Sequence, residues 1–127
     1  MTLMRIGLWA AAAIALAGPT AARKPHAADQ CFLASNVQNF SAPDTRTVYI
    51  RVGVNDIWRL DLMTECLDLP FREHLGFERA GSDPWICHPL QATIVSREAG
   101  VPQRCPVASM HRLTPEAVAA LPKSLRP

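Results

Sequence analysis

The sequence predicts a mainly β fold: a small antiparallel barrel or sandwich of about five short strands, with a short C-terminal helix and two disulfides. Three observations favour this fold. Apolar and polar residues alternate over residues 47–54, which is typical of a strand with one buried face. Four cysteines, an even number, follow an N-terminal export signal. Residues 114–122 carry the start and stop signals of one helix.

The N-terminus has the three regions of a secretory signal peptide. Residues 1–5 form a short, positively charged start, residues 6–17 are apolar without interruption, and residues 20–22 are small. An apolar run of about twelve residues is too short to cross a bilayer as a helix, which takes roughly 20. We expect cleavage after Ala22, with residues 15–17 as the second choice. No cysteine follows the run closely, which argues against a lipoprotein anchor.

The expected organisation is a signal peptide at residues 1–22, a flexible leader at 23–30 and one disulfide-containing β-rich domain at 31–127. The mature protein is then periplasmic or extracellular and has no transmembrane segment. The formal net charge of +2 falls by one, to +1, when Arg5 is removed, and the other basic residues are scattered. A scattered arrangement lacks the basic patch that nucleic-acid binding requires, so we expect no nucleic-acid partner.

Five short segments have strand character. They are residues 31–37, 47–54, 58–62, 90–97 and 107–113. The first is the weakest and the second is the strongest. Residues 98–104 contain the Gly and Pro of a hairpin loop, so we expect the last two strands to pair antiparallel.

The second and third strands can pair in two registers that keep both apolar sets on one face. One register sets Arg51 opposite Arg59, which is unfavourable because the charges are alike. The other sets Arg51 opposite Asp61, with residues 55–57 as the connecting loop, and we prefer it. Trp58 faces the core in either register because it alternates with polar residues.

The stretch 67–86 lacks a strand pattern, and residues 71–75 are expected to form one helical turn. The C-terminal helix is better marked and is expected at residues 114–121. Thr114 is its N-cap, a proline follows at the first helical position, and Pro122 ends it.

The cysteines Cys31, Cys66, Cys87 and Cys105 allow three ways of forming two disulfides. In the expected hairpin, Cys87 and Cys105 precede antiparallel strands, which separates them by about 20 Å, whereas bonded Cα atoms lie about 5.5 Å apart. This excludes Cys87–Cys105, and with it Cys31–Cys66. Of the two pairings left, we prefer the one with Cys66–Cys87, because this bond closes the stretch without a strand pattern. It leaves Cys31–Cys105 to tie the first strand to the last. The chain has no Cys-x-x-Cys pair, which favours structural disulfides over a redox role.

The other chemically capable side chains form no recognisable catalytic or metal motif. His74, His88 and His111 are too far apart in sequence for zinc-ligand spacing. Ser82 lies in a turn at residues 81–84 and lacks the Gly-x-Ser-x-Gly context of a nucleophile. We therefore assign no catalytic, cofactor-binding or metal-binding residue.

Four carboxylates in and near the long connection form a loose acidic group: Glu65, Asp68, Glu73 and Glu78. A hydrolase with paired carboxylates could use such a group, but nothing in the sequence fixes their separation. The sequence therefore does not favour a hydrolase site at these carboxylates.

Three aromatic side chains, Tyr49, Trp58 and Trp85, could form a binding surface. Alternation places Trp58 in the core, however, and Trp85 is expected to pack on the disulfide of Cys87. These residues therefore favour a structural interpretation.

Several segments together resemble a family of small exported bacterial proteins that is classed only as a domain of unknown function. The segments are residues 44–50, 58–62, 66–69, 85–87, 103–107 and 113–117. The resemblance covers roughly residues 31–121 and includes all four cysteine positions. It implies export and disulfides, and it supplies no activity, cofactor or catalytic residue.

The sequence favours a non-enzymatic exported protein, a binding or envelope-associated module whose partner could be another envelope protein. One alternative is an inhibitor of a hydrolase that acts through residues 67–86. A second alternative is a small hydrolase that uses the carboxylates of the same stretch. The sequence predicts no cofactor.

Overall fold

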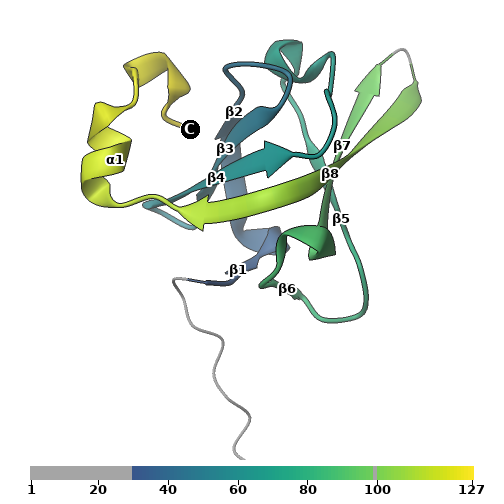
Figure 1. Ribbon diagram of the computed structural model, residues 1–127, viewed down its shortest axis with the longest axis horizontal. Coiled ribbons are helices and arrows are strands. Elements are labelled where there is room, and N and C mark those ends of the chain that lie inside the picture. Colours follow the sequence, from purple (N-terminus) through teal and green to yellow (C-terminus); the bar gives the residue numbers. More distant parts are fainter. Residues whose placement is uncertain (1–29, 99) are drawn as a thin grey trace, which may run out of the picture.

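The computed structural model describes residues 30–98 and 100–127 of the chain (Figure 1). The predicted signal peptide at 1–22 and all but the last residue of the predicted leader at 23–30 lie outside these residues. In the part that is described, no helix is long and apolar enough to span a membrane.

The described residues form eight strands, one α-helix and four short 3₁₀ helices. The strands are β1 (Phe32–Leu33), β2 (Val37–Ser41), β3 (Thr47–Val52), β4 (Asp56–Leu62), β5 (Gly76–Arg79), β6 (Trp85–Ile86), β7 (Ala92–Glu98) and β8 (Val101–Arg112). The helices are η1 (Ala34–Asn36), η2 (Leu69–Phe71), η3 (Pro89–Gln91), α1 (Pro115–Ala120) and η4 (Lys123–Leu125). The mainly β fold with a short C-terminal helix is confirmed.

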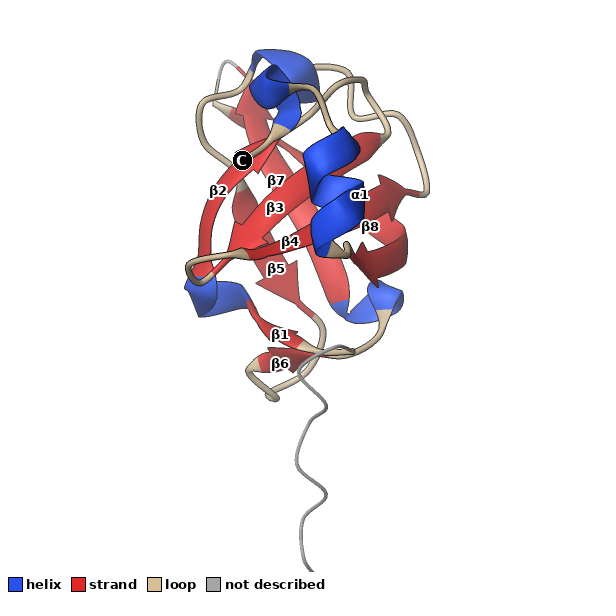
Figure 2. Cartoon of the chain, turned by 90° about the vertical axis from the view of Figure 1, so that its left-hand side faces the viewer, coloured by secondary structure: helices blue, strands red, loops and turns tan. Residues whose placement is uncertain are grey.

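Six of these strands form one antiparallel sheet in the order β2-β3-β4-β8-β7-β5. The sheet curls into a half-barrel, with β2 and β5 as its two outer strands (Figures 1 and 2). β1 and β6 pair separately and lie at one end of the half-barrel (Figure 2). With eight strands, the described residues contain about three more than the sequence predicts.

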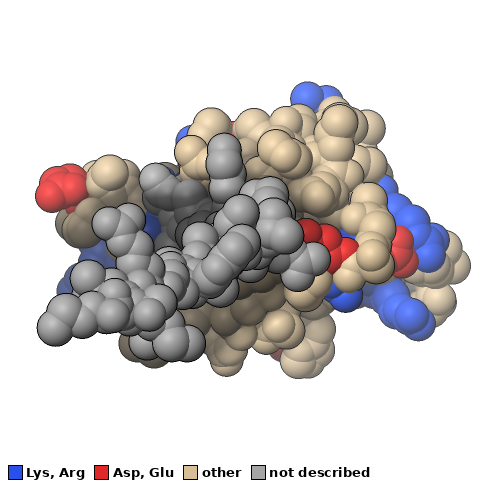
Figure 3. All heavy atoms as spheres, turned by 90° about the horizontal axis from the view of Figure 1, so that it is seen from below, with Lys and Arg blue, Asp and Glu red and all other residues tan. Residues whose placement is uncertain are grey.

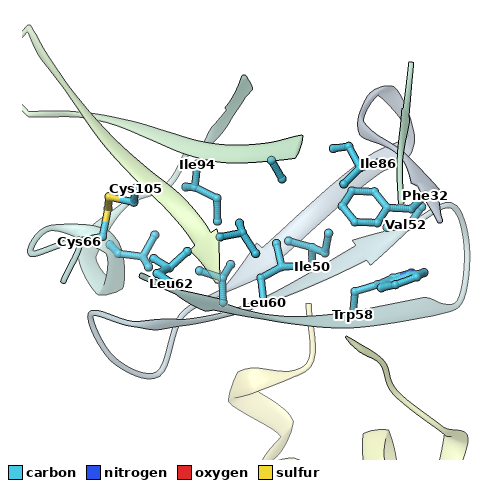
Figure 4. Packing of buried hydrophobic residues seen from close by; sticks show 14 residues of the cluster. Phe32, Ile50, Val52, Trp58, Leu60, Leu62, Cys66, Ile86, Ile94 and Cys105 are labelled. Atoms are coloured by element: carbon cyan, nitrogen blue, oxygen red, sulfur yellow. A yellow bond between two sulfur atoms is a disulfide. The ribbon is translucent and has the colours of Figure 1, made fainter. Parts of the chain in front are cut away.

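The core lies inside the curl and is built from alternate residues of the strands (Figure 4). Ile50 of β3, Leu60 of β4 and Ile94 of β7 are completely buried. Trp58 is 2% exposed, as its position in the alternation predicts, and its ring centroid lies 5.2 Å from that of Phe32. The small β1–β6 pair therefore contributes directly to this core.

Part of the outer face of β3 and β4 is buried as well, which the alternating pattern does not predict. Thr47, Tyr49 and Ile57 are each less than one-tenth exposed. The C-terminal segment lies on this side of the sheet, with α1 in front of the strands in Figure 2. It is held there by a hydrogen bond from the Leu113 amide to the carbonyl of Ile57 (2.8 Å) and by one from the Ser41 hydroxyl to the carbonyl of Leu125.

The helix itself forms where the sequence predicts it. The Thr114 hydroxyl accepts a hydrogen bond from the Ala117 amide at 3.2 Å, which is the expected N-cap. Pro115 occupies the first turn, and Pro122 follows the end of the helix.

The predicted register of the β3–β4 hairpin is wrong. Arg51 lies opposite Ile57 and not opposite Asp61. The turn begins at Gly53, before the predicted 55–57 loop, because Gly53 adopts a φ of +62° that glycine reaches without strain. Asp61 instead accepts hydrogen bonds from Arg59 on its own strand (3.0 Å) and from Ser109 on β8. The slip keeps the apolar residues inside because it is even-numbered.

The preferred disulfide pairing is also wrong. The bonds are Cys31–Cys87 and Cys66–Cys105, which is the other pairing that the sequence leaves open. Cys31 directly precedes β1 and Cys87 directly follows β6, and the antiparallel pairing of these strands brings the cysteines together. β6 has only two residues, too few to show a strand pattern. Cys105 lies inside β8, where it faces the core beside Cys66.

Several strands extend beyond or lie outside the predicted segments. β8 begins at Val101 and not at 107. Its first half, which contains Pro102 and Pro106, pairs only with β7, and pairing with β4 begins at Val107. Because only one side of the first half is paired, it tolerates proline as an edge strand does. The predicted strand at 31–37 is instead the short β1 and η1, followed by β2, which the sequence misses. The helical turn expected at 71–75 does not form: η2 ends at Phe71, and residues 72–75 connect it to β5 without a helix or strand.

Candidate functional site

A hollow in the described part of the molecule lies beside β5. It has a volume of about 740 Å³ and is lined by residues 71–78 together with Val95 and Arg97 of β7. We call it the β5 hollow. Basic and acidic side chains gather at the end of the molecule formed by β5, β7 and β8, on the right of Figure 3.

One wall of the β5 hollow is an aromatic side chain on an anchored segment. Phe71 ends η2 and is 84% exposed, the most exposed of the large apolar side chains described. Leu69, two residues earlier, is completely buried, as is the Cys66–Cys105 disulfide. The Leu69 amide donates to the carbonyl of Cys66 (3.0 Å), and the Phe71 amide donates to that of Asp68 (3.0 Å). The exposed ring is therefore presented by a segment that is tied to the core.

The charged groups around the β5 hollow divide into paired and unpaired ones. Arg104 donates from Nε to Oε2 of Glu78 (2.9 Å) and from Nη2 to Oε1 (3.0 Å), and these hydrogen bonds raise the pKa of Arg104. Arg72 contacts Asp68 at 3.5 Å, yet its buried Nε has no hydrogen-bond partner among the described residues. Arg97 forms no ion pair with any residue that the structure describes. Arg72, Arg97 and Arg104 therefore match Asp68, Glu73 and Glu78 in number, and Arg97 and Glu73 are the two of them that form no ion pair among the described residues.

The acidic group predicted from the sequence does not form a set of free carboxylates. Asp68 and Glu78 are each paired with an arginine. Glu73 lines the β5 hollow, and Glu65 is exposed outside it. Two of the four carboxylates are thus already engaged by arginine side chains.

The three histidines lie in two different places. His74 lines the β5 hollow, whereas His88 and His111 line another hollow of about 460 Å³ near the end of β8. In residues 30–98 and 100–127, no group of three His, Cys, Asp or Glu side chains is placed to hold a metal ion. Ser82 is exposed in the connection between β5 and β6.

The three aromatic residues do not form a common surface. Trp58 and Tyr49 are buried on opposite faces of the sheet, and Trp85 is half-buried in β6. The aromatic side chain that is presented to solvent is Phe71, which sequence reasoning placed in a helical turn and did not consider for binding.

The model of a family of unknown function, DUF6491, matches residues 2–127 of the chain. The chain belongs to this family. Membership confirms the resemblance seen in the sequence and attaches no activity to the β5 hollow. No curated protein and no solved structure matches the chain.

Proposed function

We propose that this member of DUF6491 is an exported, non-catalytic binding module that holds a segment of another protein in the β5 hollow. The observation that carries the proposal is the 84% exposure of Phe71 on a segment anchored by buried Leu69 and by the Cys66–Cys105 disulfide. Exposed aromatic side chains next to a concave surface are typical of protein-binding sites, where they supply much of the binding free energy.

Anchoring of the η2 segment supports this role because an ordered segment loses little conformational entropy when it binds. A hollow of about 740 Å³ is large enough for several side chains of a partner. The lining also combines apolar and charged groups, as in protein interfaces whose apolar centre has a polar rim.

Export is supported by the N-terminal pattern and by the oxidised state of all four cysteines. Disulfides form and persist in oxidising compartments such as the periplasm or the extracellular medium. The proposed partner is accordingly another protein of the envelope or the extracellular medium.

A photo-crosslinking amino acid in place of Phe71 tests the proposal in cells that export the protein. We expect a crosslinked adduct of discrete mass from position 71. The same amino acid in place of Leu90, which is 68% exposed on η3, is the matched control and should give no such adduct. Equal adducts at both positions, or none at either, would overturn the proposal.

Inhibition of a hydrolase is a second candidate function, favoured by the presentation of Phe71 on a disulfide-anchored segment. Within residues 67–86, β5 and β6 are strands of the two sheets, so the candidate inhibitory part is restricted to residues 67–75 and 80–84, and the first of these carries Phe71. This candidate requires that the crosslinked partner be a hydrolase. The wild-type protein should then lower its turnover, whereas Phe71→Ala should not.

A further inference from the structure

We propose that the β5 hollow recognises a partner segment with an apolar side chain and a carboxylate at positions i and i+2 of an extended chain. The apolar side chain would pack on Gly76 and Val95, and the carboxylate would bind Arg97. This inference rests on the proposed binding function and names the chemistry of the segment that is bound.

Gly76 is the first observation. Its φ is not in the left-handed region, unlike those of Gly53, Gly81 and Gly100, so the backbone does not require glycine there. A Cβ at this position would meet only the carbonyl oxygen of Val95 at 3.5 Å and its Cβ at 3.6 Å, which are ordinary contacts. Packing therefore does not require glycine either. Gly76 leaves the backbone at the start of β5 without a side chain beside Val95, so a ligand can approach this part of the sheet closely.

The side chains of β7 give the second observation. Val95 lies directly opposite Gly76 in the β5–β7 register, and both line the hollow. Thr93, Val95 and Arg97 share the outward face because Ile94 and Ser96 are buried on the inward face. Val95 and the bare backbone of Gly76 thus form an apolar patch in the lining of the hollow, which we call its floor.

Charge gives the third observation. Glu78, the acidic group nearest this floor on β5, is already engaged by two hydrogen bonds from Arg104. Arg72 is paired with Asp68, and its unpartnered Nε is buried. Arg97 is exposed, lines the hollow and forms no ion pair with the described residues, so its guanidinium group can bind a carboxylate with two parallel hydrogen bonds.

The spacing follows from strand geometry. Arg97 is two residues beyond Val95 on the same face of β7, which separates their Cα atoms by roughly 6.6 Å. Side chains at i and i+2 of an extended peptide have the same separation, roughly 6.6 Å, and also point to one side. An extended segment along β7 can therefore place an apolar group over Val95 and a carboxylate at Arg97 together.

Selection from a phage-displayed library of random peptides tests this inference with the full mature chain as bait. We expect the wild-type protein to enrich peptides with apolar-x-acidic or acidic-x-apolar spacing. Arg97→Gln should enrich the apolar residue without the acidic one, and it should bind peptides selected by the wild type about tenfold more weakly. Gly76→Val fills the floor and should enrich no such peptides. Thr93→Val, on the same face of β7 but outside the lining of the hollow, is the matched control and should select like the wild type.

The possible results separate this inference from the proposed function. Peptides that bind wild type and Gly76→Val equally, or without an acidic preference, would overturn the inference and leave a binding role for the hollow. Failure to enrich any peptide, with no crosslink at position 71, would overturn both. Self-association of the bait that Gly76→Val abolishes would identify a second copy as the occupant and would overturn the inference. Retention of the fold in each variant is checked by circular dichroism and by the absence of free thiols.

Discussion

The two halves of the six-stranded sheet differ in how many of their faces are covered. In the β3–β4 half, the inner face lies in the core, and Tyr49 and Ile57 on the outer face are 8% and 6% exposed beneath the C-terminal segment. In the β5–β7 half, Ile94 is buried on the inner face, whereas Val95 and Arg97 on the outer face line an open hollow. One half is covered on both faces and the other on one.

This difference assigns different tasks to the two halves. β3 and β4 supply six of the fourteen residues of the buried hydrophobic cluster, and they bury apolar area on their outer face as well, which stabilises the fold. The uncovered face of β5 and β7 contributes little to stability, so its side chains can serve binding. Substitutions should therefore affect mainly stability in the first half and mainly binding in the second.

The largest effect should come from Trp58→Ala on β4. Trp58 is 2% exposed and packs against Phe32, so its truncation leaves a large cavity and should lower the free energy of unfolding by about 3–5 kcal/mol. Chemical denaturation followed by circular dichroism measures this change. The exposed control Leu90→Ala should change stability by less than about 0.5 kcal/mol. A loss for Trp58→Ala as small as that of the control would contradict the assignment of the core to this half.

Removal of each disulfide in turn sharpens the comparison. The double variants Cys66→Ala/Cys105→Ala and Cys31→Ala/Cys87→Ala should each lose about 2–5 kcal/mol of stability. They should differ in binding, because Cys66–Cys105 anchors the segment that carries Phe71, whereas Cys31–Cys87 joins β1 to β6. Crosslinking from position 71 should therefore fall in the first variant and persist in the second. Equal crosslinking in both double variants would show that the Cys66–Cys105 disulfide does not hold the segment that carries Phe71.

Gly76→Val should separate stability from binding. Glycine in a strand is less stable than a residue with a side chain by roughly 0.5–1 kcal/mol, and valine has high strand propensity. The added Cβ has room. We expect a melting temperature equal to or slightly above that of the wild type, together with loss of peptide binding. A clear fall in the melting temperature would mean that the glycine is required by the fold.

The smallest effect should come from the Arg104–Glu78 pair, which lies on the exposed side of the β5–β7 half. Arg104→Gln should leave the unfolding transition unchanged within error, because exposed ion pairs are screened by solvent. The pKa of Arg104 is raised by its hydrogen bond to Glu78, so any stabilisation by the guanidinium would be lost only in strongly alkaline solution. Thermal melts at neutral pH and at two salt concentrations measure the effect. A large fall in stability would contradict the assignment of a binding role to this face.

Sequence reasoning predicted the parts of the fold whose pattern is local. The alternation around Ile50 and the capping residue Thr114 each specify an element within a few neighbouring residues, and both elements form. β6 is too short for any periodicity, and Pro102 and Pro106 make the first half of β8 read as a loop. These strands exist because of pairing with partners distant in the sequence, which a local pattern does not record.

Only part of the candidate site can be predicted from the sequence, because strand pairing brings the rest of its residues together. The stretch 67–86 was identified as a candidate surface, and it contains the η2 and β5 walls of the hollow. Val95 and Arg97 come from β7 and join the site only through the β5–β7 register. Phe71 was missed because the exposure of one aromatic residue depends on tertiary packing. Gly76 gave no signal, since a glycine at the edge of a connection is expected to be part of a turn.

The interleaved order of the disulfides has a consequence for how the protein is made. Cys31 bonds to Cys87 and Cys66 bonds to Cys105, so each bond encloses one end of the other. A chain that is threaded through a membrane from its N-terminus exposes Cys31 and Cys66 first, and oxidation in that order would join two cysteines that are not partners in the folded protein. If the chain is exported as proposed, the native bonds form either after β1 and β6 have paired or after a disulfide isomerase has reshuffled the first bond. Yield in a host with and without such an isomerase reports which route the chain takes.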